Sequence, residues 1–179
     1  MKAVIQRVID ACVTVEGVLK GRVDSGLLVY IGVALEDTEK DADWLAEKIV
    51  NMRIFNDNEG IMNFSIKDIV NPEKKLVNSK GLSASDMKIG ILAVSQFTLL
   101  ADARKGRRPS WSRAAPPEKA KNLYEYFIAK VREHGLVCEC GEFQAHMKVM
   151  YTNDGPVTIL LDSRDSLKTE QPSRELGSY

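Results

Sequence analysis

The sequence is short of cysteine, and it has neither a long hydrophobic run nor a signal-peptide pattern. Its three cysteines are an odd number, and the spacing of Cys138-Glu139-Cys140 does not suit a zinc knuckle. No segment approaches the roughly 18 apolar residues of a membrane span. The start, Met1–Arg7, is charged where a signal peptide is apolar. We therefore expect a cytoplasmic protein with no metal, no cofactor and no membrane partner.

The sequence also has no net charge and only two histidines. Lysine and arginine total 25, as do aspartate and glutamate, so attraction to a polyanion requires a local basic patch. His146 is a conceivable base, but no Ser-His-Asp order or metal-ligand spacing accompanies it, and we expect a partnered or exposed side chain. The sequence therefore lacks the nucleophile and adjacent base that most hydrolases contain.

β-Branched and apolar residues, interrupted by turn residues, dominate the first third of the chain and predict a β meander. Its parts are a strand over Ala3–Ile9 and Cys12–Val15, a hairpin turn at Glu16-Gly17, a return strand over Val18–Val23, a turn at Asp24-Ser25-Gly26 and a central strand over Leu27–Val33. Further strands are expected over Met87–Leu100, Val137–Cys140, Phe143–Tyr151 and Val157–Asp162.

Two helices are predicted. Thr38 and Asp41 resemble a capping box ahead of apolar residues at helical spacing, and Pro116-Pro117-Glu118 opens a second helix that Gly135 ends. Together these elements predict one α+β domain over residues 1–162, with a β-rich, barrel-like core of antiparallel or mixed sheets and two outer helices.

Three segments are expected to be turns or loops. Asn56–Gly60 lacks the distal ligands of a calcium loop, so it is interpreted as a turn. Residues 71–86 are polar without an apolar period and are interpreted as an inserted surface loop. Residues 163–179 are polar and aperiodic, which predicts a mobile C-terminal tail.

Polar residues at the end of an apolar run indicate a functional site. Ser95-Gln96-Phe97-Thr98 follows such a run, and a buried hydroxyl or amide without a partner costs about 1–3 kcal/mol. A second stretch, Asn153–Thr158, contains the Gly155-Pro156 pair, which can hold its carbonyl oxygens in a fixed direction. Alone, this stretch is best explained as a tight turn.

A basic stretch follows the Ser95 segment. Such a stretch is usually solvated surface, but its position would let cations hold the phosphates of a nucleic acid whose last base stacks on an aromatic ring. The basic residues are Arg104, Lys105, Arg107, Arg108 and Arg113.

Four separated stretches, Ile5–Val8, Ser95–Leu99, Arg107–Ser110 and Asn153–Thr158, resemble the D-aminoacyl-tRNA deacylase family in the family's order. The resemblance runs from Met1 to about Asp162. It implies a homodimer that hydrolyses the ester bond of D-aminoacyl-tRNA, and of mischarged glycyl-tRNA, as a form of chiral proofreading.

The resemblance also implies a role for each site residue. Ser95, Gln96, Phe97 and Thr98 line the catalytic pocket, whose substrate-contacting walls include Phe143, Met147 and Thr158. Gly155 and Pro156 form a cis peptide inserted from the partner subunit to reject L-amino acids, and Arg7 braces them. The basic residues bind tRNA. The 2′-hydroxyl of the terminal ribose activates the ester, so main-chain donors can suffice for catalysis.

Two alternatives remain open. One is a non-catalytic RNA- or DNA-binding module that uses the basic stretch. The other is a hydrolase of small esters or N-acyl compounds with Thr158 as nucleophile, although a threonine without an adjacent base is largely unreactive at neutral pH.

Overall fold

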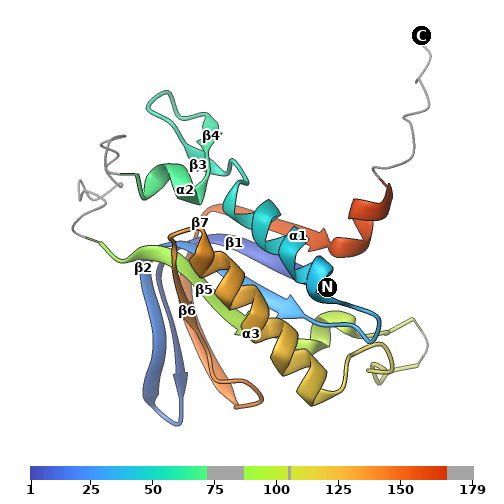
Figure 1. The fold of residues 1–179 in the computed structure, drawn as a ribbon. Helices are drawn as coiled ribbons and strands as arrows, with labels where there is room; N and C mark the ends of the chain where they lie inside the picture. The colour runs from blue at the N-terminus through green and yellow to red at the C-terminus, as the bar shows by residue number, and fades with distance from the viewer. Residues whose placement is uncertain (72–86, 105, 169–179) are drawn as a thin grey trace.

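The computed structural model describes residues 1–71, 87–104 and 106–168 (Figure 1). Lys105, most of the loop expected over residues 71–86, and residues 169–179 of the expected tail lie outside this part of the chain.

A five-stranded mixed sheet forms the centre of the fold, in the order β6-β5-β2-β1-β7. β1 pairs antiparallel with β2 and β7, whereas β5 pairs parallel with β2 and β6. The strands are β1 (Lys2–Val15), β2 (Val18–Gly32), β5 (Ile89–Ser95), β6 (Val137–Cys140) and β7 (Met147–Asp162); β3 (Phe55–Asn56) and β4 (Met62–Phe64) form a separate small hairpin. The α+β class is confirmed, but the linear strand order does not show the expected barrel-like closure.

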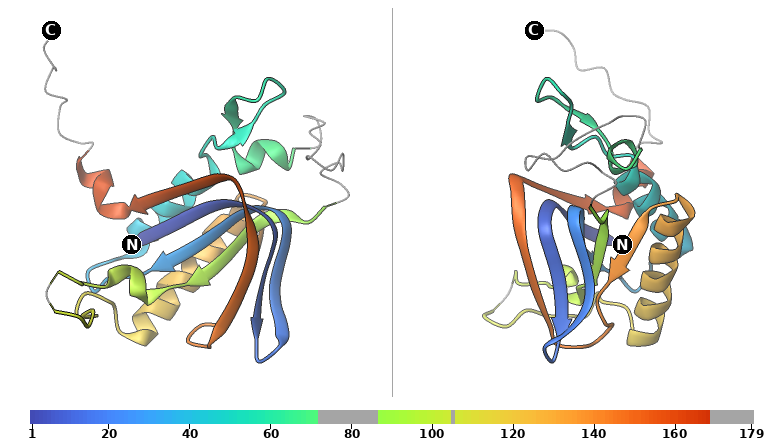
Figure 2. Two further views of the ribbon diagram at one scale, coloured as in Figure 1. Left: turned by 180° about the vertical axis from the view of Figure 1, so that it is seen from behind. Right: turned by 90° about the vertical axis from the view of Figure 1, so that its left-hand side faces the viewer.

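Two long helices cover one face of the sheet, as Figures 1 and 2 show. α1 (Glu39–Val50) begins with the predicted capping box, in which the Thr38 amide donates to the Asp41 carboxylate at 2.8 Å. α3 (Pro117–Glu133) has proline at its first position and is followed by Gly135 at φ +75°. Both predicted helices are therefore confirmed. The shorter helical segments are α2 (Ile66–Ile69), η3 (Phe97–Leu100) and η4 (Ser163–Lys168).

Both faces of the central strands are buried. On the helix side, Ile5, Val29 and Ile91 join the apolar stripes of α1 and α3 in one core. On the other side, residues including Leu28 and Leu92 form a second cluster where the long strands bend across their own sheet (Figure 2). Burial on both faces explains the continuous apolar runs of β2 and β5.

The predicted turn at Asp24-Ser25-Gly26 is wrong, because β2 continues through it. Gly26 adopts φ +137° and pairs with Gly90 of β5. A Cβ atom built on Gly26 would lie 1.9 Å from the Gly90 carbonyl oxygen. The glycine therefore allows two strands to approach closely instead of reversing the chain.

Two other strand boundaries also differ from the sequence prediction. The strand expected over Met87–Leu100 ends at Ser95, and the chain then turns into η3. The strand expected from Phe143 begins only at Met147, and β7 then continues without interruption past Gly155-Pro156 to Asp162. The turn before β7 and the turn after β5 lie at the same end of the sheet.

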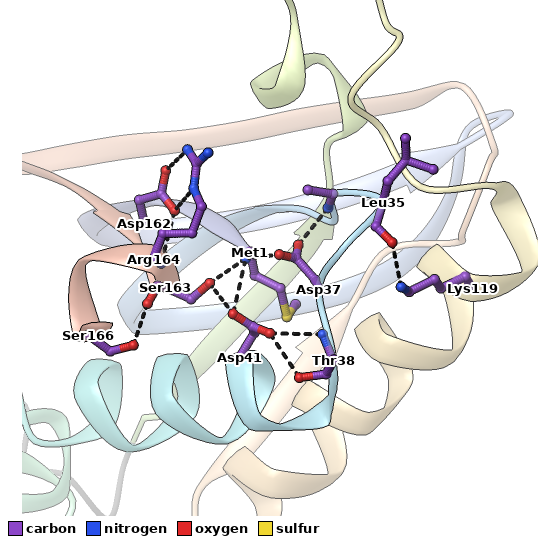
Figure 3. Close-up of polar contacts among 11 residues, drawn as sticks. Met1, Leu35, Asp37, Thr38, Asp41, Lys119, Asp162, Ser163, Arg164 and Ser166 are labelled. Atoms are coloured by element: carbon purple, nitrogen blue, oxygen red, sulfur yellow. Dashed lines mark hydrogen bonds and ion pairs between the residues drawn. The ribbon is translucent and has the colours of Figure 1, made fainter. Parts of the chain in front are cut away.

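The expected tail begins with an ordered segment. η4 packs its first residue, Ser163, against the chain's N-terminus, so residues 163–168 form a helical segment, and the mobility expected for the tail stays a prediction. The Met1 ammonium group lies 2.7 Å from the Asp37 carboxylate and donates to the Ser163 hydroxyl, which in turn donates to Asp41 at 2.6 Å (Figure 3). Burial raises the pKa of Asp41, but hydrogen bonds from Ser163 and Thr38 outweigh it and lower that pKa overall.

An Asp37→Asn variant tests the stabilising role of this network. We expect it to lower the free energy of unfolding by about 3 kcal/mol, because removing one partner of a buried ion pair leaves the Met1 ammonium group with only the longer 3.9 Å ion pair to Asp41. Denaturant unfolding measures the change. The exposed neighbour Glu36 provides the control, and Glu36→Gln should stay within about 0.5 kcal/mol of the native protein. Equal stability of the two variants would contradict this role.

Candidate functional site

A pocket of about 600 Å³ opens at the end of β5. Its lining contains three of the four predicted catalytic residues, Ser95, Gln96 and Phe97, together with Phe143 from the turn before β7 and Met147, the first residue of β7. These segments are almost 50 residues apart in the chain. The fold brings them together because β5 and β6 are parallel neighbours, and the chain after each of them emerges at the same edge of the sheet.

Thr98 and Gln96 lie where the chain leaves the sheet. The Gln96 amide N–H donates to the Ile31 carbonyl at 2.7 Å, and the Ala101 N–H donates to the Thr98 carbonyl at 3.1 Å. The Gln96 side chain donates a hydrogen bond to the Thr98 hydroxyl. Thr98 is exposed and does not line the pocket. Its hydroxyl is thus paired with a neutral amide, which cannot serve as a base.

Tyr124 is a pocket residue that sequence reasoning assigned only to the buried stripe of α3. Its hydroxyl donates to the Ala93 carbonyl at 2.8 Å, and its ring lies 6.1 Å from that of Phe143. Burial raises the pKa of this phenol well above its usual range, so it remains a neutral donor. Tyr124 therefore fixes the last part of β5 directly before Ser95. The sequence did contain a signal for this contact, because a tyrosine in a buried apolar stripe usually has a hydrogen-bond partner for its hydroxyl.

An exposed pair of aromatic rings lies beside the pocket. The rings of Phe97 and Trp111 are 5.2 Å apart and inclined by 67°. Phe97 lines the pocket, whereas Trp111 lies outside its lining. Trp111 lies within the basic stretch of the sequence, and sequence reasoning predicted no separate role for it.

The basic stretch forms a loop that departs from η3 and returns to the pocket. Two backbone hydrogen bonds between Asp102 and Ser110, 2.8 and 2.9 Å long, close this loop. Arg104 contacts the Asp102 carboxylate at 2.9 and 2.5 Å and holds the pKa of that carboxyl well below its usual range. Arg107, Arg108 and Arg113 are exposed and form no ion pair with any described residue. Lys105, also predicted to bind tRNA, lies outside the described part.

The remaining titratable candidates show no catalytic arrangement. His146 lines the pocket but is exposed, as expected. Burial raises the pKa of Cys138 to about 12, so this thiol stays protonated at neutral pH. Asn56 ends β3, and the predicted turn follows it over residues 57–60, where the Asp57 side chain accepts hydrogen bonds from the Glu59 and Ile61 amides at 2.9 Å. Among the described residues, no group of three or more acidic, His or Cys side chains is placed to bind a metal.

The Gly155-Pro156 stretch protrudes from β7. Gln6 of β1 pairs with Thr158 and Val8 pairs with Asn153, so four residues of β7, 154–157, lie opposite the single residue Arg7. The Asn153 side chain ties the base of this bulge by donating to the carbonyl oxygens of Arg7 and Val157, both at 3.0 Å. Gly155 and Pro156 are exposed, and the peptide bond between them is cis. We call residues 154–157 the corner.

Arg7 lies directly beneath this corner and is only 9% exposed. One terminal nitrogen, Nη1, donates to the Ile54 carbonyl at 2.8 Å and to Asn56 Oδ1 at 3.2 Å. The Nε atom lies 2.9 Å from the Asp154 carboxylate, although its N–H is not aligned for a hydrogen bond. A Cβ atom built on Gly155, which has φ +113°, would lie 2.9 Å from the Arg7 Nη2 atom. Arg7 and Gly155 are therefore in close contact.

The corner and the pocket lie in different parts of one subunit. Arg7 pairs with Leu27, which precedes Ile31, the β2 partner of Ser95, by four residues. With strand spacings of about 4.8 Å and rises of about 3.3 Å per residue, the corner is about 19 Å along the sheet from Ser95. No residue of the corner lines the pocket, and neither does Thr158, which accepts a hydrogen bond from Gln6 at 3.1 Å beside the corner.

Comparison with protein families gives a match over most of the chain. The model of a family described as D-Tyr-tRNA(Tyr) deacylase matches residues 4–162. A D-aminoacyl-tRNA deacylase of Thermosipho melanesiensis is 52% identical over 165 residues, which cover 92% of this chain and 98% of the relative. One of Thermotoga petrophila is 51% identical over 163 residues, which cover 91% and 97% of the two chains.

Solved structures share the fold. The structure of a c-Myc DNA unwinding element binding protein superposes with a TM-score of 0.74 at 37% identity, over 90% of this chain and 98% of the other. A probable eukaryotic D-amino acid tRNA deacylase superposes with a TM-score of 0.69 at 16% identity, over 89% and 97% of the two chains. At that identity the second structure supports the fold alone. Among the described residues, no helix is long and apolar enough to cross a membrane.

Proposed function

Because this chain belongs to the D-aminoacyl-tRNA deacylase family, whose members are hydrolases of D-aminoacyl-tRNA, we propose that its pocket at the end of β5 holds the ester-linked 3′ end of that substrate. The observation that carries the proposal is the convergence of Ser95, Gln96 and Phe97 with Phe143 and Met147 on one cavity. A cavity with an apolar lining and a few polar groups is the usual form of a small-molecule site.

Catalysis in this proposal depends on main-chain groups. The first N–H groups of any helical segment have no acceptor within that segment, which leaves the amides at the start of η3, Phe97 and Thr98, available to an oxyanion. The neighbouring 2′-hydroxyl of the terminal ribose activates the ester, and water is the nucleophile. Donors held in place before the reaction contribute about 3–4 kcal/mol each to such a step.

Chiral selection is assigned to the corner. Gly155 and Pro156 present their carbonyl oxygens where an L side chain would lie, so L-aminoacyl groups are rejected by a clash. D-Aminoacyl groups of many kinds, and glycyl groups, enter the pocket without touching the corner. Arg7 holds the corner in place through its contacts with Ile54, Asn56 and Asp154.

The proposal includes a homodimer, and the distance between the corner and the pocket supports it. A corner about 19 Å from Ser95 cannot act on an ester bound in the same subunit. We assign each pocket the corner of the partner subunit instead. A two-fold axis then makes both sites complete at once.

The basic loop is assigned to the tRNA backbone. Arg107, Arg108 and Arg113 are exposed on the segment that runs from η3 to the pocket residue Ala114, whereas Arg104 is paired with Asp102. Lys105 is assigned the same role from its position in the sequence. Phosphate contacts of this kind position a nucleic acid without reading its sequence.

The proposed selectivity is tested by incubating the purified protein with the same tRNA charged with a D-amino acid, its L counterpart or glycine. We expect rapid release of the D-amino acid and of glycine, and negligible release of the L-amino acid. Equal hydrolysis of the D and L substrates would rule out chiral selection. Hydrolysis of neither would rule out the activity itself.

A Thr98→Ala variant distinguishes the main-chain mechanism from a threonine nucleophile. Because the Thr98 hydroxyl is bonded to the Gln96 amide and lies outside the pocket lining, we expect the variant to keep activity within about tenfold, the loss of one neutral hydrogen bond. Single-turnover hydrolysis of D-aminoacyl-tRNA measures this. Loss of activity to the uncatalysed rate would instead identify Thr98 as the nucleophile.

A second function, nucleic-acid binding without turnover, is favoured by one observation. A structural relative 37% identical to this chain carries the name of a DNA unwinding element binding protein. Such a role predicts binding of uncharged single-stranded DNA that weakens steeply with salt. Binding measured at two salt concentrations, with tRNA as competitor, tests whether the basic loop serves both nucleic acids.

A further inference from the structure

The aromatic pair beside the pocket is more exposed than large aromatic side chains usually are. Phe97 is 56% exposed and Trp111 is 41% exposed, although the two rings contact each other. Contiguous exposed apolar surface with a polar rim is typical of interaction sites. Because the rings are inclined by 67°, they cover little of each other's faces, and a flat ligand can stack on either ring.

The backbone around Trp111 is fixed. The Trp111 carbonyl accepts the Ala114 N–H at 2.9 Å, the Arg113 carbonyl accepts the Leu35 N–H at 3.1 Å, and the Ala115 N–H donates to Val33 at 2.9 Å. The loop before it is closed by the bonds between Asp102 and Ser110. Trp111 is therefore presented on a rigid support, which reduces the entropic cost of using it as a binding surface.

The charge around Trp111 suits a polyanion. Arg107, Arg108 and Arg113 surround it in the chain, are exposed and form no direct ion pair with a described acidic residue, although the charge of Arg113 contributes to the lowered pKa of Asp102. The loop's acidic residue, Asp102, is held by Arg104. Since the whole chain has no net charge, this patch is a local concentration of positive charge beside an aromatic face. That combination is typical of single-stranded nucleic-acid sites.

We propose that Trp111 is the stacking platform for the base that precedes the terminal nucleotide in the single-stranded 3′ end of the tRNA. Phe97 lines the pocket and would contact the terminal nucleotide. Trp111 contacts Phe97 from outside the pocket lining and would contact the preceding base. Arg107, Arg108 and Arg113 hold the phosphates on either side. The inference rests on the proposed binding of the ester in the pocket.

Tryptophan fluorescence tests the contact directly. The chain has two tryptophans, and the other, Trp44, packs against the helix-side core on α1. A Trp44→Phe variant therefore reports on Trp111 alone. We expect a single-stranded RNA ending in cytidine-cytidine-adenosine to quench this fluorescence to saturation, and adenosine alone to leave it unchanged. No quenching at RNA concentrations that saturate binding would overturn the proposal.

Kinetics with two substrates separate stacking from a structural effect. In a Trp111→Leu variant, we expect KM for D-aminoacyl-tRNA to rise about tenfold or more, with kcat within about twofold, and Trp111→Phe to restore most of the affinity. For D-aminoacyl-adenosine, which lacks the preceding base, the KM of Trp111→Leu should equal that of the native protein. An equal rise in KM for both substrates would overturn the inference, while failure of the native protein to hydrolyse either would overturn the proposed function instead.

Discussion

Replacing Arg7 with alanine is expected to reduce the discrimination between D- and L-aminoacyl-tRNA by about 10- to 100-fold, the equivalent of losing charge-assisted hydrogen bonds of about 1.5–3 kcal/mol. The guanidinium contacts Asp154 of the corner and donates to Ile54 and Asn56. Its removal therefore deletes the contacts that link the corner to residues 54–56. The measurement is the ratio of kcat/KM for one tRNA charged with the D- and the L-amino acid.

Arg22 supplies the control for this experiment. It lies on the neighbouring strand β2, is largely exposed and pairs with Asp24 rather than with the corner. Arg22→Ala should therefore keep the native ratio. A folded Arg7→Ala protein, verified by circular dichroism, that also keeps the native ratio would show that the corner needs no brace. An Arg7→Lys variant should be intermediate at best, because one ammonium group cannot replace both Nη1, which donates to Ile54 and Asn56, and Nε, which lies against Asp154.

Filling the pocket should abolish turnover without disturbing the fold. Ala145 lines the pocket from the turn before β7, and it does not belong to either hydrophobic core. We expect Ala145→Trp to lower kcat/KM for D-aminoacyl-tRNA about 100-fold or more, since a displacement of the ester by about 1 Å can already cost that much.

The matched control adds the same side chain to the same turn outside the pocket. Glu142 is exposed, does not line the pocket and makes an ion pair with Lys20 on the surface, which contributes little. Glu142→Trp should retain activity within about twofold, as expected for a surface substitution. Equal activity of the two variants would mean that the reaction takes place elsewhere.

Local patterns predicted the two long helices, and they also located the polar end of β5, where the pocket opens. The capping box at Thr38 and the Pro117 start of α3 are determined by residues within one helical turn, so sequence alone could locate them. Ser95 and Gln96 were recognisable because a polar group at the end of a buried strand costs free energy unless it has a partner, so its presence there indicates a site.

Features that depend on contacts between distant residues could not be predicted in the same way. Gly26 is typical of a turn until Gly90 is known to lie opposite it in another strand. Tyr124 fits a buried helical stripe, and only the fold reveals that its hydroxyl holds Ala93 beside the pocket. Ser163 belongs to a polar, aperiodic segment, and its burial depends on the Met1 ammonium group 162 residues away.

The family resemblance assigned the corner and the pocket to one site, and the register of the sheet separates them within a subunit. Thr158 lies with the corner rather than with the pocket lining. The distance of about 19 Å between the corner and Ser95 follows from strand pairing, which no local pattern specifies. This separation is the physical reason why the account requires two subunits.

Mixed dimers test that requirement most directly. The Arg7→Ala and Ala145→Trp chains would be co-expressed with different affinity tags, and dimers containing one of each would be purified through both tags. In such a dimer, the open pocket of the Arg7→Ala subunit receives the intact corner of the Ala145→Trp subunit. We therefore expect the mixed dimer to regain the native preference for D-aminoacyl-tRNA that the Arg7→Ala homodimer lacks. A mixed dimer as unselective as the Arg7→Ala homodimer, or a protein that forms no dimer, would contradict the account.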